Sequence, residues 1–175
     1  MKESLEPMNI SEPHRVTKDE WEKLKDLRLR ALADSPRAFG STLEGTKDKP
    51  EETWLKQIEN TYTYAIEAEG QFVALAVFRK DDDGVWTING VWTDPKFRRR
   101  GLSKKLFSEI LKQAEELSVK TIELSVNATQ SDAIELYKQS GFEIVETRED
   151  QLMGDGNTYN EYIMRMNLNQ TNLQE

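Results

Sequence analysis

The chain has 175 residues, no cysteine, one histidine and a formal net charge of −8 at pH 7. The lack of cysteine excludes disulfides, thiolate metal sites and a cysteine nucleophile. A single histidine, His14, does not favour a zinc site or a histidine-based triad, so no metal is expected. The acidic charge argues against general nucleic-acid binding, which relies on a basic surface.

The length fits a single domain. We expect residues 1–12 and 169–175 to be flexible tails and residues 13–168 to form the domain. The opening segment is charged and has no apolar core, so it is not typical of a signal peptide. Nowhere does an apolar run approach the 18 residues of a membrane span. These features predict a soluble, cytoplasmic protein with no membrane association.

Four helices are predicted from apolar residues that recur at helical spacing. The first, 18–33, follows Thr17 as a plausible N-cap and ends before Ser35 and Pro36. The strongest pattern lies in 101–117, where apolar residues recur every three or four positions. The predicted helices cover residues 18–33, 51–59, 101–117 and 131–139.

Six strands are predicted from β-branched and aromatic runs bounded by turn residues. Glu69, Gly70 and Gln71 separate the first two, as expected for a hairpin. The predicted strands cover residues 61–68, 72–79, 85–93, 121–126, 142–145 and 159–166. The order of elements predicts an α/β (α+β) domain with one mixed central sheet of six to seven strands, flanked by about four helices.

A short basic loop joins the third strand to the long helix. Five basic residues fall within eight positions of an otherwise acidic chain: Arg98, Arg99, Arg100, Lys104 and Lys105. The first turn of a helix has unpaired backbone amides and a dipole that attracts anions, and Gly101 lets a phosphate approach them. The alternative is a solvated basic loop that caps the helix, although stability alone favours acidic residues there. The pattern therefore indicates a phosphate site.

Two motifs, in order along the chain, resemble the GNAT acetyltransferase superfamily. Arg98-x-x-Gly101-x-Ser103, after Thr93-Asp94-Pro95, is similar to the pyrophosphate loop Q/R-x-x-G-x-G/A. Residues 133–142, AIELYKQSGF, are similar to the pattern A-I-x-L-Y-x-x-x-G-F. The close match covers roughly residues 85–145. Residues 27–41 also resemble a subgroup of the family whose acceptors are poorly defined.

The resemblance implies acetyl-CoA as co-substrate and a GNAT-like fold. The pyrophosphate would be bound, mainly through main-chain amides, by Arg98, Arg99, Arg100, Gly101, Leu102 and Ser103. The backbone of Val91, Trp92 and Thr93 would face the pantetheine arm, where two neighbouring strands separate. Tyr137 matches the tyrosine that acts as general acid and protonates the departing CoA thiolate. The acceptor amine would attack the thioester directly.

Three positions leave alternatives open. Ser103 replaces the usual glycine or alanine; its hydroxyl either donates to phosphate or crowds the loop. Gln130 stands where the family often has asparagine, and Asn127 is the other candidate. Glu123 is a hypothetical general base acting through water, and the alternative is a surface glutamate.

Trp86 and Trp92 share strand parity and therefore one predicted face. They either line an acceptor pocket or belong to the core, and we favour the core.

The sequence thus predicts an N-acetyltransferase that acts on a primary amine, in a small molecule or a protein. The alternative function is a non-catalytic acyl-CoA sensor or interaction module. Another kind of nucleotide-binding domain is disfavoured because neither a P-loop nor a G-x-G-x-x-G pattern occurs. The acceptor is expected to contact the first helices, the loop near Phe39 and the final strands. An exposed terminal strand could support a homodimer.

Overall fold

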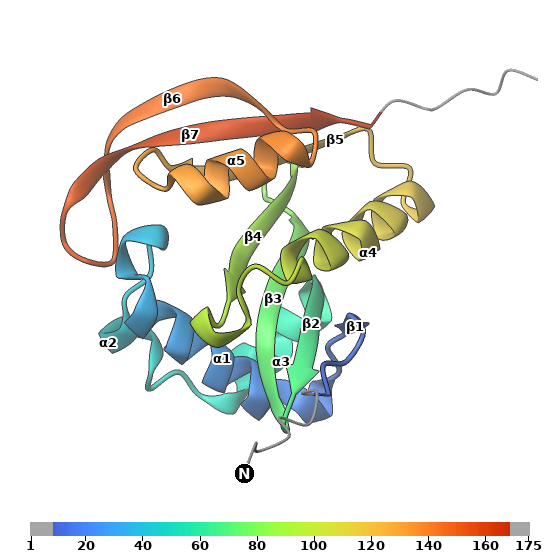
Figure 1. Ribbon diagram of the computed structural model, residues 1–175. Helices are drawn as coiled ribbons and strands as arrows, with labels where there is room; N and C mark the ends of the chain where they lie inside the picture. Colours follow the sequence, from blue (N-terminus) through green and yellow to red (C-terminus); the bar gives the residue numbers. More distant parts are fainter. Residues whose placement is uncertain (1–8, 169–175) are drawn as a thin grey trace, which may run out of the picture.

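The computed structural model describes residues 9–168. They form a seven-stranded sheet in the order β1-β2-β3-β4-β5-β7-β6 (Figure 1). β4 and β5 run parallel, and every other neighbouring pair is antiparallel. The strands are β1 (His14–Arg15), β2 (Tyr62–Ala68), β3 (Gln71–Lys80), β4 (Trp86–Thr93), β5 (Thr121–Asn127), β6 (Glu143–Leu152) and β7 (Thr158–Asn167).

Four longer helices accompany the sheet: α1 (Trp21–Asp34), α3 (Glu51–Asn60), α4 (Leu102–Glu116) and α5 (Ser131–Gln139). A one-turn helix, α2 (Leu43–Thr46), and three 3-10 turns, Lys18–Glu20, Pro36–Ala38 and Pro95–Phe97, complete the described elements. The predicted fold class, a mixed sheet of six to seven strands with about four helices, is therefore confirmed.

Helices cover both faces of the sheet, and each face has its own apolar core. Leu24 and Leu27 of α1 and Trp54 of α3 pack in one core, whereas Leu106 and Ile110 of α4 pack in the other. β3 lies between the two cores and supplies alternate residues to each, with Leu75 and Val77 on the α1 face and Ala74, Ala76 and Phe78 on the α4 face. This strand is buried on both sides, which explains its continuous apolar sequence.

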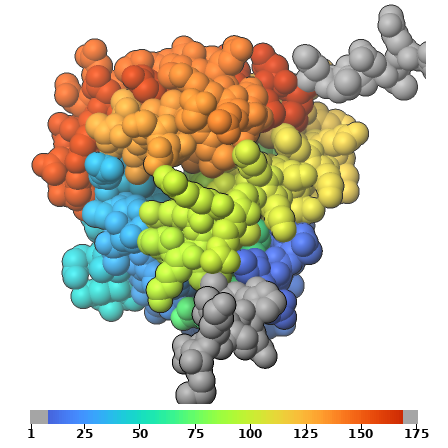
Figure 2. All heavy atoms as spheres, in the orientation of Figure 1, coloured from blue at the N-terminus to red at the C-terminus, as the bar shows by residue number. Residues whose placement is uncertain are grey.

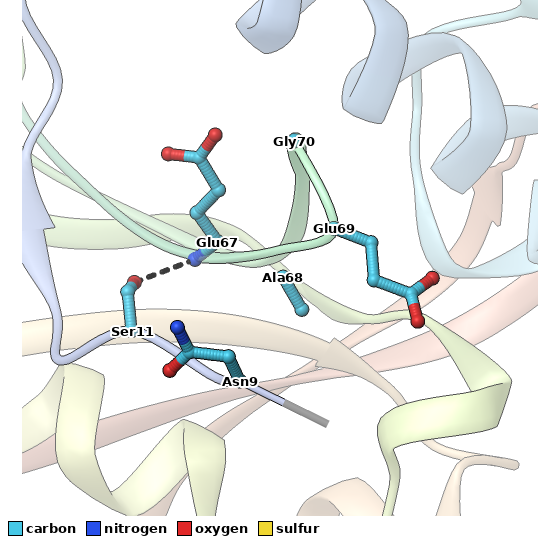
Figure 3. A pocket seen from close by; sticks show the side chains of 6 residues that line it. All are labelled: Asn9, Ser11, Glu67, Ala68, Glu69 and Gly70. Atoms are coloured by element: carbon cyan, nitrogen blue, oxygen red, sulfur yellow. Dashed lines mark hydrogen bonds between the residues drawn. The ribbon is translucent and has the colours of Figure 1, made fainter. Parts of the chain in front are cut away.

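The N-terminal end of the described chain is attached to β2. Ile10 forms an isolated bridge with Ala68, and the Ser11 amide donates to the Glu67 carbonyl at 2.8 Å. Residues 9–12, assigned from the sequence to a tail, thus lie against the sheet, while the rest of both predicted tails falls outside the described residues. A pocket of about 410 Å³ lies beside this contact, at the turn between β2 and β3 (Figure 3).

β6 differs most from its prediction. The pattern indicated a strand over residues 142–145, but β6 spans ten residues, nearly all of them exposed. The added stretch, residues 146–152, is polar up to its last residue, Leu152, and has no alternation of apolar residues. Pairing with β7 holds it in the sheet. β6 is also one of the two edge strands, and it exposes Ile144 and Val145.

The β6–β7 hairpin reaches the segment that follows α1 (Figure 1). The Gly154 amide, in the hairpin turn, donates to the Phe39 carbonyl at 2.7 Å. A Cβ on Gly154 would lie 2.6 Å from the Ser41 carbonyl oxygen and 2.9 Å from that of Pro36. These distances are shorter than a non-bonded contact allows, so glycine permits the two loops to pack.

Gly154→Ala is therefore expected to lower the free energy of unfolding by about 1–3 kcal/mol, because two backbone segments would have to move apart. Urea denaturation measures the change. Gly40→Ala is the matched control, since a Cβ there meets nothing within 4 Å. Equal stability of the two variants would show that the hairpin turn is not held against this loop.

Candidate active site

β4 and β5 pair over a short stretch and then separate. The described pairs are Trp86 with Ile122 and Thr87 with Glu123. From Ile88 onward, β4 keeps its partner β3 but has no partner in β5 among residues 9–168. Val91, Trp92 and Thr93, predicted to face the pantetheine arm, all lie in this unpaired stretch. Their backbone groups on the side away from β3 are therefore not used by the sheet.

A bulge at Gly90 changes the face to which the next residues point. Gly90 has φ +61, and the register with β3 shifts between Leu75 and Val77. One extra residue in β4 reverses the alternation of side chains. As a result, Trp86 packs on the α4 face with Phe78, while Trp92 is buried in the α1 core. The shared face predicted for the two tryptophans is wrong, although their assignment to core packing is confirmed.

The basic loop after β4 is anchored by its apolar and acidic residues. Phe97 is buried, and Asp94 caps the turn Pro95–Phe97 by accepting from the Lys96 amide at 2.9 Å. Arg99 and Gly101 have φ of +62 and +73, so the backbone twice enters the left-handed region before α4 starts. Figure 2 shows this loop, in yellow-green, on the surface between the blue N-terminal helices and the orange segment that contains α5.

The amides at the end of this loop and in the first turn of α4 have no acceptor within the part of the chain that the structure describes. Gly101 is the N-cap of α4 and has no side chain to cap the helix. From Arg99 to Lys104, no backbone N–H donates to another group of residues 9–168. The hydroxyl of Ser103 lies 3.4 Å from that of Thr93, so it contacts the end of β4. This combination of uncapped amides and exposed arginines is suited to a phosphate.

Two ion pairs to α1 hold the loop, and sequence reasoning missed both. Arg98 donates to the Thr93 carbonyl at 2.9 Å and to Asp34 at 2.8 Å. Arg30 donates to Asp94 at 2.9 Å and also to the Phe72 carbonyl. The Arg98 side chain is thus part of the loop's support, which leaves its main chain to face a ligand.

Asp34 lies at the centre of this support. The same carboxylate oxygen accepts from Ser35, Trp92 and Arg98. Partial burial acts to raise the pKa of the Asp34 carboxyl, but these three hydrogen bonds outweigh it and hold the pKa below its usual value. Asp34 therefore stays ionised at neutral pH and joins α1, β4 and the loop.

Tyr137 of α5 is a buried, oriented phenol. Its ring stacks on Phe107 of α4, with 5.8 Å between centroids, and contacts Phe142 edge-on at 6.3 Å. Burial raises the pKa of the Tyr137 hydroxyl to about 12. The group is therefore protonated at neutral pH, as a proton donor must be. Within residues 9–168 the Tyr137 hydroxyl makes no hydrogen bond, and its oxygen keeps some contact with solvent.

Asn127 and Gln130 differ in what their side chains contact. The Asn127 amide donates to the Arg37 carbonyl at 2.9 Å and accepts twice from Thr129, at 2.9 and 2.8 Å. These contacts fix the end of β5 and occupy the amide. Gln130 is the half-buried N-cap of α5 and makes no side-chain cap bond. Of the two candidates, Gln130 is the one whose side chain is free of such contacts in the described chain.

Glu123 lies where β4 and β5 are still paired, opposite Thr87. Its carboxylate accepts twice from Arg165, at 2.8 and 3.2 Å, and lines a pocket with Lys120 and Trp86. The structure thus places Glu123 in an ion pair before the strands separate. This position does not favour the role of general base.

Comparison with known proteins identifies the family. The model of the acetyltransferase (GNAT) family matches residues 21–142, more than half of the chain. The chain therefore belongs to the GNAT acetyltransferase family. The matched residues include the basic loop and Tyr137. Among the described residues, none of the helices has both the length and the apolar character needed to cross a membrane.

Two curated relatives are similar over part of their length. Mycothiol acetyltransferase of Thermobifida fusca is 27% identical over 141 residues, which are 76% of this chain and 43% of the relative. The ribosomal protein bS18 alanine N-acetyltransferase of Escherichia coli K12 is 29% identical over 86 residues, 49% of this chain and 57% of the relative. The chain thus spans about half the length of the curated relatives it matches.

Solved structures support the fold. The ribosomal-protein-S18-alanine N-acetyltransferase of Escherichia coli has a TM-score of 0.71 at 19% identity, covering 95% of this chain and 99% of that one. The PaiA N-acetyltransferase of Thermoplasma acidophilum, in complex with coenzyme A, has a TM-score of 0.70 at 15% identity, covering 92% and 100%.

Proposed function

We propose that the protein transfers the acetyl group of acetyl-CoA to a primary amine by direct attack. The observation that carries this proposal is the separation of β4 from β5 in the stretch that leads into the uncapped loop, together with the buried phenol of Tyr137, which stacks on α4. Membership of the GNAT family and the similarity to a structure in complex with coenzyme A support it.

Each part of the site has a role in the proposal. Main-chain amides from Arg98 to Ser103 bind the pyrophosphate, and exposed Arg99 and Arg100 add positive charge. The backbone groups of Val91, Trp92 and Thr93 that β5 does not pair align the pantetheine arm, apart from the Thr93 carbonyl, which accepts from Arg98. Gln130 is the side chain that we assign to a further polar contact with this substrate.

The chemistry needs one proton donor. The neutral amine attacks the thioester carbonyl carbon, a C–N bond forms, and the C–S bond breaks. The sulfur leaves as a thiolate, which takes the proton of the Tyr137 hydroxyl. The proton lost by the amine passes to water, and Tyr137 regains its own from solvent. No covalent intermediate with the protein is involved.

A thiol-release assay tests the proposal. A colorimetric thiol reagent follows CoA formation across a panel of amines, and the protein contributes no background because it has no cysteine. The expected result is amine-dependent release with saturation in acetyl-CoA. Saturable binding of acetyl-CoA without release from any amine would favour the alternative, a non-catalytic acyl-CoA sensor.

The hypothesis that Glu123 is the base has its own test. Because Glu123 is ion-paired where the strands are still joined, we expect Glu123→Gln to leave the pH dependence of kcat/KM unchanged within about 0.3 pH units. Asp132→Asn, at the start of α5, is a control for loss of one surface charge. A shift or loss of the acidic limb in Glu123→Gln alone would restore Glu123 as the base.

Four sequence-based expectations stay predictions. They are a cytoplasmic location, the absence of a metal, no nucleic-acid partner and a homodimer. For the homodimer, the exposed edge strand β6 is the surface that we propose, and sedimentation velocity measures the state of assembly.

A further inference from the structure

Arg28 reaches from α1 to the bulge in β4. Its guanidinium carbon lies 4.6 Å from the centroid of the Phe39 ring. Its Nη1 lies 4.0 Å from the position that a Cβ on Gly90 would take. Gly90 directly precedes Val91–Thr93, the stretch proposed to face the pantetheine arm. Arg28 therefore lies next to the start of this stretch, on the α1 face of the sheet.

This guanidinium has no anionic partner among residues 9–168. No carboxylate there lies within 4.0 Å of it, and it donates no hydrogen bond to another described group. The neighbouring carboxylates of α1 are already paired, Asp26 with Arg30 and Asp34 with Arg98. Arg28 is also half-buried, and burial lowers the pKa of its guanidinium.

A half-buried cation without a counterion does not stabilise the fold, because burial removes water that the Phe39 ring replaces only in part. In the described chain, every side-chain nitrogen that is fully buried has a hydrogen-bond partner. The unpartnered nitrogens of Arg28 are therefore in contact with solvent. They can therefore be reached by a ligand. Unpaired charges of this kind are typical of binding sites.

We propose that Arg28 binds the carboxylate of the acceptor, so that the acceptors are small amines that carry a free carboxylate, as amino acids do. This inference rests on the proposed function. The planar guanidinium matches a carboxylate with two parallel hydrogen bonds, and a single arginine balances a single negative charge. A carboxylate held there keeps the amine of the same molecule near the end of the β4 bulge, beside Val91.

The surroundings orient the guanidinium and disfavour a second cation. The Phe39 ring, itself buried in the α1 core, packs against the guanidinium, and the Phe39 backbone carbonyl accepts from Gly154 of the β6–β7 hairpin. A polyamine, by contrast, would bring a second cation toward Arg28 and be repelled. The inference thus selects amino carboxylates from the broader group of primary amines.

The test compares amino acids with their carboxamides, in which the carboxylate alone is lost. For the wild-type protein, we expect kcat/KM to be about ten- to a hundredfold higher for the free acid of the preferred amino acid than for its amide. In Arg28→Gln, the ratio of kcat/KM for the acid to that for the amide should fall to within about threefold of the ratio of the reactivities of the two amines in water. The fall should come from a higher KM for the acid. Arg28→Lys should recover part of the ratio because it keeps the charge.

Arg15→Gln is the matched control. Arg15 also stacks on an aromatic ring, with 4.3 Å between its guanidinium carbon and the centroid of Tyr62, but it lies on β1 at the far edge of the sheet. This variant should keep the wild-type ratio. Unchanged affinity for acetyl-CoA in Arg28→Gln shows that the variant is folded.

A binding measurement separates this inference from the proposed function. Calorimetry with the same acids and amides, in the presence of CoA, does not depend on turnover. We expect the wild type to bind free acids at least about tenfold tighter than amides. In Arg28→Gln this preference should be lost. Equal binding or equal acetylation of acids and amides by the wild type, or a ratio that survives Arg28→Gln, overturns the inference. Tight, Arg28-dependent binding without any acetylation would overturn the proposed function and leave the inference in place.

Discussion

Tyr137→Phe is expected to lower kcat by about a hundredfold or more, because general acid catalysis commonly contributes 10²–10⁴. The dissociation constant for acetyl-CoA should change by less than about threefold, since the loop amides that bind the pyrophosphate are unaffected. The phenyl ring keeps its contacts with Phe107 and Phe142, so the variant should fold. Thiol release gives kcat, and calorimetry gives the affinity.

The pH dependence adds a second check. Burial raises the pKa of the Tyr137 hydroxyl to about 12, so its acid form is present at all lower pH values and is lost as the pH rises through 12. The wild-type kcat should therefore show no loss of this acid up to about pH 10. A descending limb near pH 8 that disappears in Tyr137→Phe would contradict the raised pKa.

Tyr64→Phe is the control for this experiment. Tyr64 is a buried tyrosine on the same face of the sheet, and its hydroxyl donates to Gln113 of α4 at 3.1 Å. Its loss removes one phenolic hydroxyl without touching the site. If the two variants turn over at similar rates, Tyr137 is a packed core aromatic and not the acid.

Local patterns predicted those elements whose two faces differ in polarity. The periodic residues Leu102, Leu106 and Ile110 located α4 within one residue of its observed bounds, and α5 matches its predicted range. β6 was predicted too short because it is exposed on both faces and its pairing with β7 leaves no alternation to detect. The two-residue strand β1 is also held by pairing alone.

In the candidate site, too, local motifs could be predicted from the sequence and long-range contacts could not. The basic loop and Tyr137 could be located because each lies in a short local motif. The support of the loop could not, because Arg98 and Asp34 are 64 residues apart and meet only when α1 packs on the sheet. Gly90 did carry a signal, since a glycine inside a strand often marks a bulge. Recognising it would have placed Trp92 on the correct face.

A carboxylate introduced at the start of α4 distinguishes the two interpretations of the basic loop, a phosphate site and a loop that only caps the helix. Ser103→Asp puts a negative charge in the first turn, where the helix dipole favours it by about 0.3–1 kcal/mol. If the loop merely caps the helix, the variant gains stability and loses nothing. If the loop binds pyrophosphate, like charges meet at short range, and the dissociation constant for acetyl-CoA should rise at least about tenfold. We expect both effects together, a slightly more stable protein that binds its substrate poorly.

Ser108→Asp is the matched control, because Ser108 is exposed on the same helix but beyond its first turn. It should change neither the affinity nor the stability by much, since the dipole effect fades within one turn. Urea denaturation and calorimetry measure the two quantities, at low and high salt. The loss of affinity in Ser103→Asp should shrink as salt screens the repulsion. An affinity equal to that of Ser108→Asp would mean that the anion-binding amides of α4 do not hold the pyrophosphate, whatever the rest of the site does.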